Sequence, residues 1–279
     1  GEPMTGSGRF ARTGGSDIVN SQLLTLDALV ACLLAAIIWN LITWFFGIPS
    51  SSSHALIGGL LGVVIFAAGL AAINLNGLFK VLLGLFFSPL AGFFVGFGVL
   101  RLIYFLVRNA TPRINVFFKR AQFFTAVGLA LSHGTNDAQK TMGIITLSLL
   151  IGGALTEFQV PFWVVFISAA TMGLGAGLGG WRLIRTLGGK FYKIRPVDGF
   201  ATQISSAFVI YASSFGGAPV STTQDVSSAI VGVGASERLS KVRWSVVSDI
   251  FTAWMVTIPV SGLIAAGIYW VLVYWKAQM

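Results

Sequence analysis

The residues best suited to bind an anion are two runs of hydroxyl side chains, each following a Gly-x-Pro turn. "GIPSSSSHALIGGLLGVV" (47–64) carries the first run and "GAPVSTTQDVSSAIVGVG" (217–234) the second. Hydroxyls donate hydrogen bonds to oxyanions, and a helix beginning after such a turn adds free N–H groups and a positive dipole end. Helix capping is the simpler alternative, since Ser and Thr are favoured N-caps. Because the pattern occurs twice, we predict an oxyanion site built from Ser51, Ser52, Ser53, Ser221, Thr222 and Thr223.

A second polar stretch offers ligands for a cation. "LSHGTNDAQKTMG" (131–143) separates two apolar runs that are each too short to cross a bilayer alone. An ionisable residue at membrane depth is costly and indicates function, whereas the alternative is an ordinary polar loop outside the membrane. Asp137, with neutral oxygens from Asn136 and Thr135, predicts a cation site for Na⁺ or, through its carboxyl group, for H⁺.

Four polar side chains bordering these motifs are candidates for gating or for support of the site: His54, Gln224, Gln139 and Lys140. A protonatable switch is open for His54, but a hydrogen-bonded structural role is the better interpretation. Lys140 either pairs with Asp137, contacts an anion or extends toward the membrane interface.

The elements that must position these residues are membrane helices. The chain has 279 residues, of which 55% are apolar and only 10% are charged, against about 25% charged residues in soluble domains. Hydrocarbon offers the backbone no hydrogen-bond partners, so each span is expected to be helical. We predict an all-α polytopic protein of the cell (plasma or inner) membrane, with spans at 28–46, 54–73, 81–107, 162–180, 200–215 and 246–275.

The basic residues indicate orientation rather than nucleic-acid binding. The net charge is +9, but the Lys and Arg residues cluster in short connections near 108–120 and 182–195. Such clusters mark the cytoplasmic side of a membrane protein. We therefore predict that both connections are cytoplasmic and that nucleic acid is not a partner.

The two hydroxyl motifs align without gaps and indicate an internal repeat. Given the cytoplasmic connections, the hairpin around 47–53 opens outward and the hairpin around 217–223 opens inward. Opposed hairpins of this kind predict inverted-topology repeats with re-entrant hairpins and broken helices, typical of secondary transporters. The short stretch 222–235 suits a re-entrant half-helix or a loop. The predicted divisions are a polar N-terminal segment 1–26, the remainder of the first repeat 27–108, a cytoplasmic basic loop 109–120, and the second repeat 121–279 with its Asn-Asp loop.

Together, "GTNDAQKTMG", "PSSSSHALIGG" and "PVSTTQ" resemble the inorganic phosphate transporter family of sodium- or proton-coupled symporters, over about residues 27–277. The resemblance implies two inverted repeats, each with an Asn-Asp loop on a broken helix and a Ser/Thr hairpin. It assigns the cation to Asn136 and Asp137 and phosphate to the two hydroxyl runs. A first Asn-Asp loop, which the family would place upstream of Pro49, is missing, and we interpret the chain as incomplete at its N-terminus.

The predicted function is import of inorganic phosphate by cation symport with alternating access, without enzymatic activity and with no cofactor beyond the coupling Na⁺ or H⁺. Membrane lipid is an expected partner, and the many glycines allow a homodimer. The nearest alternative is a symporter for another oxyanion such as sulfate. An intramembrane hydrolase with a nucleophile among Ser50–Ser53 and His54 or His133 as base is disfavoured, because four interchangeable serines are mirrored by a motif without histidine. A channel would require a continuous polar path.

Overall fold

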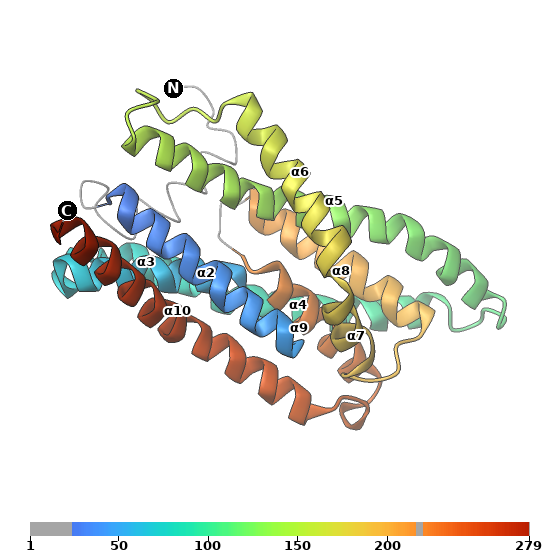
Figure 1. The fold of residues 1–279 in the computed structure, drawn as a ribbon. Helices are drawn as coiled ribbons and strands as arrows, with labels where there is room; N and C mark the ends of the chain where they lie inside the picture. Colours follow the sequence, from blue (N-terminus) through green and yellow to red (C-terminus); the bar gives the residue numbers. More distant parts are fainter. Residues whose placement is uncertain (1–23, 216–219, 279) are drawn as a thin grey trace.

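The computed structural model describes residues 24–215 and 220–278, apart from the side chains of residues 182, 183 and 215. Most of the helices run roughly along one long axis (Figure 1). They are α2 Leu26–Phe46, α3 Ser52–Ala68, η3 Leu70–Ala72, α4 Leu75–Leu106, α5 Ile114–Ile151, α6 Phe162–Gly179, α7 Trp181–Gly189, α8 Pro196–Phe215, α9 Thr222–Glu237, η4 Leu239–Lys241 and α10 Trp244–Gln278. Among the described residues, α2, α4, α6 and α10 are long and apolar enough to span a membrane, and α3 is a shorter apolar helix. The chain is a multi-pass membrane protein.

The predicted spans match these helices closely, with two informative differences. The stretch 54–73 is one turn shorter than a full span because α3 stops at Gly69, whose φ of 80° lies in the left-handed region that favours glycine. The stretch 222–235, for which a loop was the alternative, forms α9. Both short helices begin directly after a hydroxyl-rich turn.

The predicted loops differ more from the structure. A polar Asn-Asp loop at 131–143 is wrong: α5 runs without interruption from Ile114 to Ile151. The helix persists because its polar side chains find partners on other helices, so the backbone has no reason to break. The predicted basic loops 109–120 and 182–195 are also partly helical, since α5 begins at Ile114 and α7 covers Trp181–Gly189.

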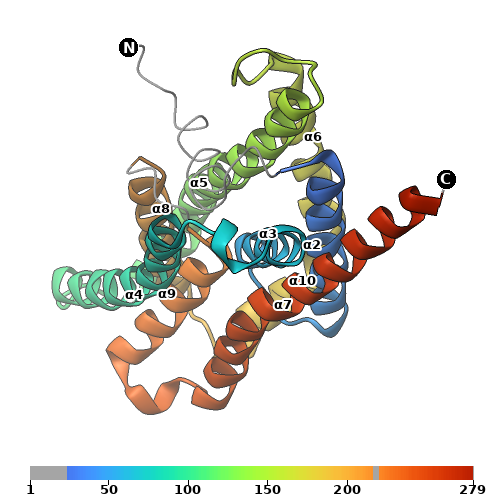
Figure 2. The same ribbon diagram turned by 90° about the vertical axis from the view of Figure 1, so that its left-hand side faces the viewer.

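The two hairpins run in opposite directions. From the centre of the molecule, α3 extends toward one end and α9 toward the other (Figure 1). Viewed along the long axis, α3 lies in the middle of the bundle, next to α2 and α10 (Figure 2). In the first turn, Gly47 O accepts a hydrogen bond from Thr186 at 2.8 Å and Pro49 O accepts one from Trp254 at 3.0 Å. The matching Gly217 and Pro219 of the second turn lie outside the described residues.

Each short helix packs on the long helix from the other half of the chain. α3 packs mainly on α10, and α9 mainly on α4. Glycine makes this close approach possible: a side chain at Gly62 would collide with the backbone of Gly262, and one at Gly232 with the backbone of Phe93. The long helices α4 and α10 correspond as well, since each follows a short 3₁₀ turn and contains an internal proline. The two halves of the chain are therefore interlocked rather than side by side.

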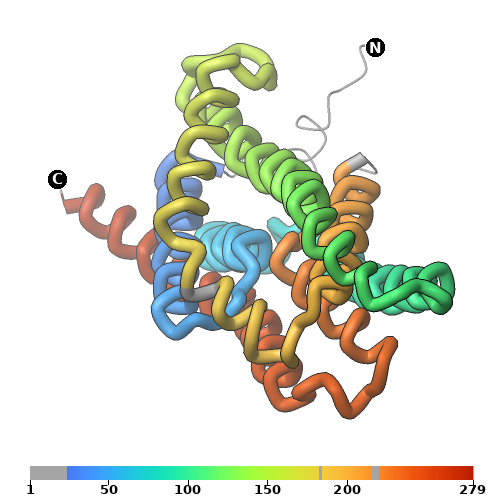
Figure 3. The backbone as a smooth tube through the Cα atoms, turned by 90° about the vertical axis from the view of Figure 1, so that its right-hand side faces the viewer, coloured from blue at the N-terminus to red at the C-terminus, as the bar shows by residue number. Residues whose placement is uncertain are grey.

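The outer ends of the two hairpins are held differently. The α8–α9 hairpin has its outer end, where α8 begins and α9 finishes, toward the viewer in Figure 3. In the first turn of α8, the fully buried Asp198 accepts from the Arg195 backbone N–H at 3.0 Å and the Lys241 ammonium at 3.0 Å. Glu237 pairs with Arg195 and, at 2.7 Å, with Lys241, and also accepts from Tyr104. At the other end, Asp27 pairs with Lys276 at 2.7 Å; their side chains are 30% and 65% exposed. We refer to Arg195, Asp198, Glu237 and Lys241 as the basal network.

Candidate functional site

Ser51 and Ser221, at equivalent positions of the two motifs, cap their helices. Ser51 has an extended backbone, and its Oγ accepts from the His54 N–H at 3.2 Å. Ser221 has the same conformation, and its Oγ accepts from the Gln224 N–H at 3.4 Å. Each bond satisfies one of the free N–H groups of the first helical turn. The capping alternative therefore describes these two hydroxyls, and phosphate binding by them stays a prediction.

His54 and Gln224, at equivalent positions of the two motifs, lie against each other. His54 Nδ1 is 2.8 Å from Ser51 Oγ, and its Nε2 is 3.5 Å from Gln224 Nε2. Both side chains are buried. This geometry is that of a hydrogen-bonded structural histidine, and it brings the starts of α3 and α9 together.

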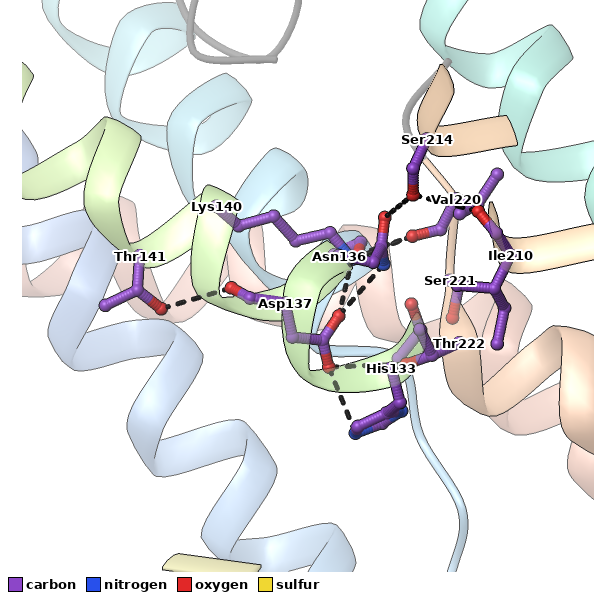
Figure 4. A network of polar contacts seen from close by, with 12 residues as sticks. His133, Asn136, Asp137, Lys140, Thr141, Ile210, Ser214, Val220, Ser221 and Thr222 are labelled. Carbon is purple, nitrogen blue, oxygen red and sulfur yellow. Dashed lines mark hydrogen bonds and ion pairs between the residues drawn. The ribbon is translucent and has the colours of Figure 1, made fainter. Parts of the chain in front are cut away.

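Lys140 of α5 bridges the two helix starts (Figure 4). Its Nζ donates to Ser53 Oγ at 2.8 Å, to the carbonyl oxygen of Val220 at 2.8 Å and to Asp137 Oδ1 at 2.9 Å. The Lys140 side chain is only 5% exposed. The interpretation that Lys140 extends toward the interface is therefore wrong. An ammonium group sits where two positive helix ends meet, and this concentration of positive charge favours an anion nearby.

Asp137 supplies the negative charge of this centre. Besides Lys140, its carboxylate accepts from Asn136 Nδ2 at 3.1 Å and from Thr222 Oγ1 at 3.3 Å, and His133 Nε2 lies 3.4 Å away (Figure 4). Asn136 is held in turn by Ser214, whose hydroxyl donates to its Oδ1 at 3.3 Å. Donors thus occupy both carboxylate oxygens, so a cation can bind Asp137 only if one of them withdraws.

The structure gathers some of the predicted residues and leaves others apart. The contacts described above gather Ser53, Thr222, Asn136, Asp137 and Lys140. Thr135 is exposed, and its hydroxyl donates to the Leu131 carbonyl of its own helix at 2.7 Å. Ser52 is exposed, and Thr223 and Gln139 are half-buried. Binding roles for these four residues stay predictions.

Sequence reasoning missed Ser214 and the Val220 carbonyl group, and it gave Lys140 too small a part. One signal was available. His133, Asp137 and Lys140 are spaced i, i+4 and i+7, which places them on one face of a helix. Reading 131–143 as a helix would have predicted a single charged face aimed at the hydroxyl motifs. No comparable pattern marks Ser214 or a backbone carbonyl.

Comparisons with known proteins agree with this architecture. The model of the phosphate transporter family matches residues 1–117 and 106–265. A probable low-affinity inorganic phosphate transporter of Bacillus subtilis is 44% identical over 273 residues, covering 96% of this chain and 82% of the relative. Its counterpart from Rhizobium meliloti is 42% identical, with 93% and 78% covered.

Among solved structures, one titled "The sodium-dependent phosphate transporter" has the same fold, with a TM-score of 0.85 and 22% identity over 96% of this chain and 86% of that one. The resemblance carried by the three sequence motifs is thereby confirmed. The two opposed helix starts, the bridging lysine and the matched sequences lead to one conclusion: the chain belongs to the phosphate transporter family.

Proposed function

We propose that this protein imports inorganic phosphate across the cell membrane by symport with Na⁺ or H⁺, through alternating access. The observation that carries the proposal is the meeting of the α3 and α9 N-termini at Lys140, with Ser53 and Thr222 beside it. The names of the relatives from Bacillus subtilis and Rhizobium meliloti support phosphate as the substrate.

The anion side of the site uses helix starts, hydroxyls and one ammonium. Backbone N–H groups and hydroxyls are neutral donors. They bind an oxyanion less tightly than fixed positive charges would, so the substrate can leave again. Lys140 adds a charge-assisted donor. In this structure Ser53 Oγ and Val220 O accept from Lys140, and we infer that phosphate takes these acceptors' place.

Coupling follows from the position of Asp137. Its carboxylate repels phosphate as long as it is not neutralised. When phosphate attracts Lys140, the carboxylate loses its 2.9 Å partner and becomes free for Na⁺ or for H⁺. The bound cation then removes the repulsion, so each ligand raises the affinity for the other.

Alternating access would use the opposed hairpins. One hairpin reaches the centre from each side of the membrane, so their separation from the long helices opens the site to one side at a time. The hydrolase alternative is set aside by family membership and by the site itself. Ser51 has a histidine partner, but the serine is buried and its oxygen is occupied as a helix cap.

The test is radiolabelled phosphate uptake into proteoliposomes containing the purified chain, under an inward Na⁺ gradient, an inward H⁺ gradient, or neither. We expect uptake with at least one gradient and its loss in Asp137→Asn. Glu157→Gln, an exposed acid outside the site, is the matched control and should transport normally. Absence of uptake under every gradient would refute the proposal. Inhibition by excess sulfate, with saturable sulfate uptake, would favour the other-oxyanion alternative.

A further inference from the structure

Asp225 is a buried acid that the phosphate and cation sites do not use. It lies in the first turn of α9 and is 0% exposed. Its equivalent in the first repeat is Ala55, also 0% exposed. A Cβ atom added at Gly92 of α4 would lie 2.8 Å from the carbonyl oxygen of Asp225, so the two helices touch at this point. The second repeat thus buries a carboxyl group where the first buries a methyl group.

The oxygens of the Asp225 carboxyl group make no hydrogen bond of normal geometry among the described residues. The polar group beside them is the hydroxyl of Ser88, one turn before Gly92 on the facing helix, which is buried and also lacks such a bond. A helix N-terminus favours an anion, but only modestly compared with the cost of an ionised carboxylate removed from water without partners. A protonated carboxyl group avoids that cost, and its O–H can donate a hydrogen bond to the Ser88 oxygen.

No counter-ion contacts this carboxyl group in the described structure. Lys140 of α5 is the basic group whose field acts on it, but its ammonium is held by Ser53, Asp137 and Val220. Several other titratable groups stand on the elements around α9, besides Glu237 at the last residue of α9 itself. They are His54 on α3, His133 and Asp137 on α5, Tyr211 and Asp198 on α8, Lys80, Arg101 and Tyr104 on α4, and Lys241 on η4.

We propose that Asp225 is a proton-binding site, protonated while α9 packs on α4 at Gly92 and deprotonated when these helices separate and water reaches the carboxyl group. The proton comes from water on one side of the membrane and returns to water on the other. This inference rests on the proposed transport function, and it adds a coupling proton bound apart from Asp137. Ala55, the equivalent residue on α3, cannot bind a proton. The movement of the α8–α9 hairpin is therefore coupled to protonation, whereas that of the α2–α3 hairpin is not.

The first test separates driven transport from exchange. Wild-type and Asp225→Asn proteins are compared in proteoliposomes for phosphate uptake under an inward H⁺ gradient and for exchange of labelled phosphate at equal concentrations on both sides. Asparagine mimics the protonated acid, so we expect driven uptake to fall about tenfold or more and exchange to stay within about twofold of wild type. Asp249→Asn, an exposed acid on α10, is the control and should change neither.

Driven uptake that persists in Asp225→Asn would overturn the inference while leaving the proposed function intact. Loss of both activities in a correctly folded variant would also overturn it, since the residue would then serve the structure or phosphate itself. A second measurement needs no transport. Infrared spectra of the wild-type protein at neutral pH should show the C=O band of a protonated carboxylic acid, absent in Asp225→Asn. Absence of that band in wild type would refute the inference even if the protein moved no phosphate.

Discussion

The two hairpins are nearly alike where they meet and unlike where they begin. At the centre, Ser51 and Ser221 cap α3 and α9 in the same way. At the outer ends, the α2–α3 hairpin has the partly exposed Asp27–Lys276 pair, whereas the α8–α9 hairpin has the basal network around the fully buried Asp198. The two hairpins are thus similar at their central ends, but their outer ends are held by ion pairs of very different burial.

The difference has an energetic meaning. An exposed ion pair contributes only about 0–1 kcal/mol, while removing one partner of a buried set leaves a charge without compensation. Burial also raises the pKa of the Tyr192 phenol, whose ring lies 4.5 Å from the Lys241 ammonium and stays neutral beside the network. We infer that the α8–α9 hairpin separates from its surroundings less readily than the α2–α3 hairpin.

Lys140 is the group that both hairpins share, so its removal should have the largest effect. In Lys140→Met the half-buried Asp137 loses its ammonium partner, and Ser53 and Val220 lose a common donor. We expect phosphate uptake to fall about 100-fold and stability to fall by about 3–5 kcal/mol. Thermal unfolding and proteoliposome uptake measure the two effects.

Lys276→Met is the matched control for that substitution, since it also removes an ammonium from an aspartate, but at an exposed site. It should cost at most about 1 kcal/mol. Equal effects of the two substitutions would contradict the central role of Lys140.

A pair of substitutions tests the difference between the outer ends of the two hairpins. Asp198→Asn removes the buried charge that Arg195 and Lys241 share, and we expect it to lower stability by about 2 kcal/mol; the loss is moderated because Arg195 is 50% exposed. Asp27→Asn should change stability by about 0.5 kcal/mol or less. The readout is the unfolding midpoint in detergent, with and without high salt. A larger loss of stability for Asp27→Asn than for Asp198→Asn would show that the α2–α3 hairpin, and not the α8–α9 hairpin, has the more strongly held outer end.

Substitutions in the interlocked packing should have a smaller effect than Asp198→Asn, and the effect should be the same in both halves of the chain. In Gly62→Ala and Gly232→Ala the new methyl group meets the backbone of α10 and α4 respectively. Each should cost about 1–2 kcal/mol, because backbone must shift to make room. Gly98→Ala on α4 has open space around the new methyl group and serves as control. Sensitivity of only one of the first two positions would show that the two contacts are not equivalent.

Much of this architecture could be predicted from the sequence, because lipid imposes simple rules. Apolar runs of span length predicted α2, α4, α6 and α10, and the duplicated motif predicted two opposed hairpins. Local patterns carry this information. Phosphate family membership was also predictable, since the three motifs are short, contiguous and specific.

The centre of the site was less predictable because its stability comes from distant contacts. The polar stretch 131–143 looks like a loop when read alone, but Lys140 finds Ser53 and Val220, 87 and 80 residues away, and the helix continues. Asp225 gave no clue to its burial, which depends on Gly92 of α4 allowing close approach. The glycine contact between α4 and α9 therefore buries a carboxyl group that no local pattern in the sequence marks.

The interlocking of the repeats has a consequence for how the protein is made. α3 cannot bury its glycine face until α10 exists, and the contact of Gly62 with Gly262 joins positions roughly 200 residues apart. At about 5–20 residues per second, synthesis leaves the first hairpin without its partner for about 10–40 seconds. During that interval the turn after Gly47, with its serines, has to be sheltered by the insertion machinery or by water at the membrane surface. α10, which is synthesised long after α3, is therefore the helix that completes the packing of the first hairpin.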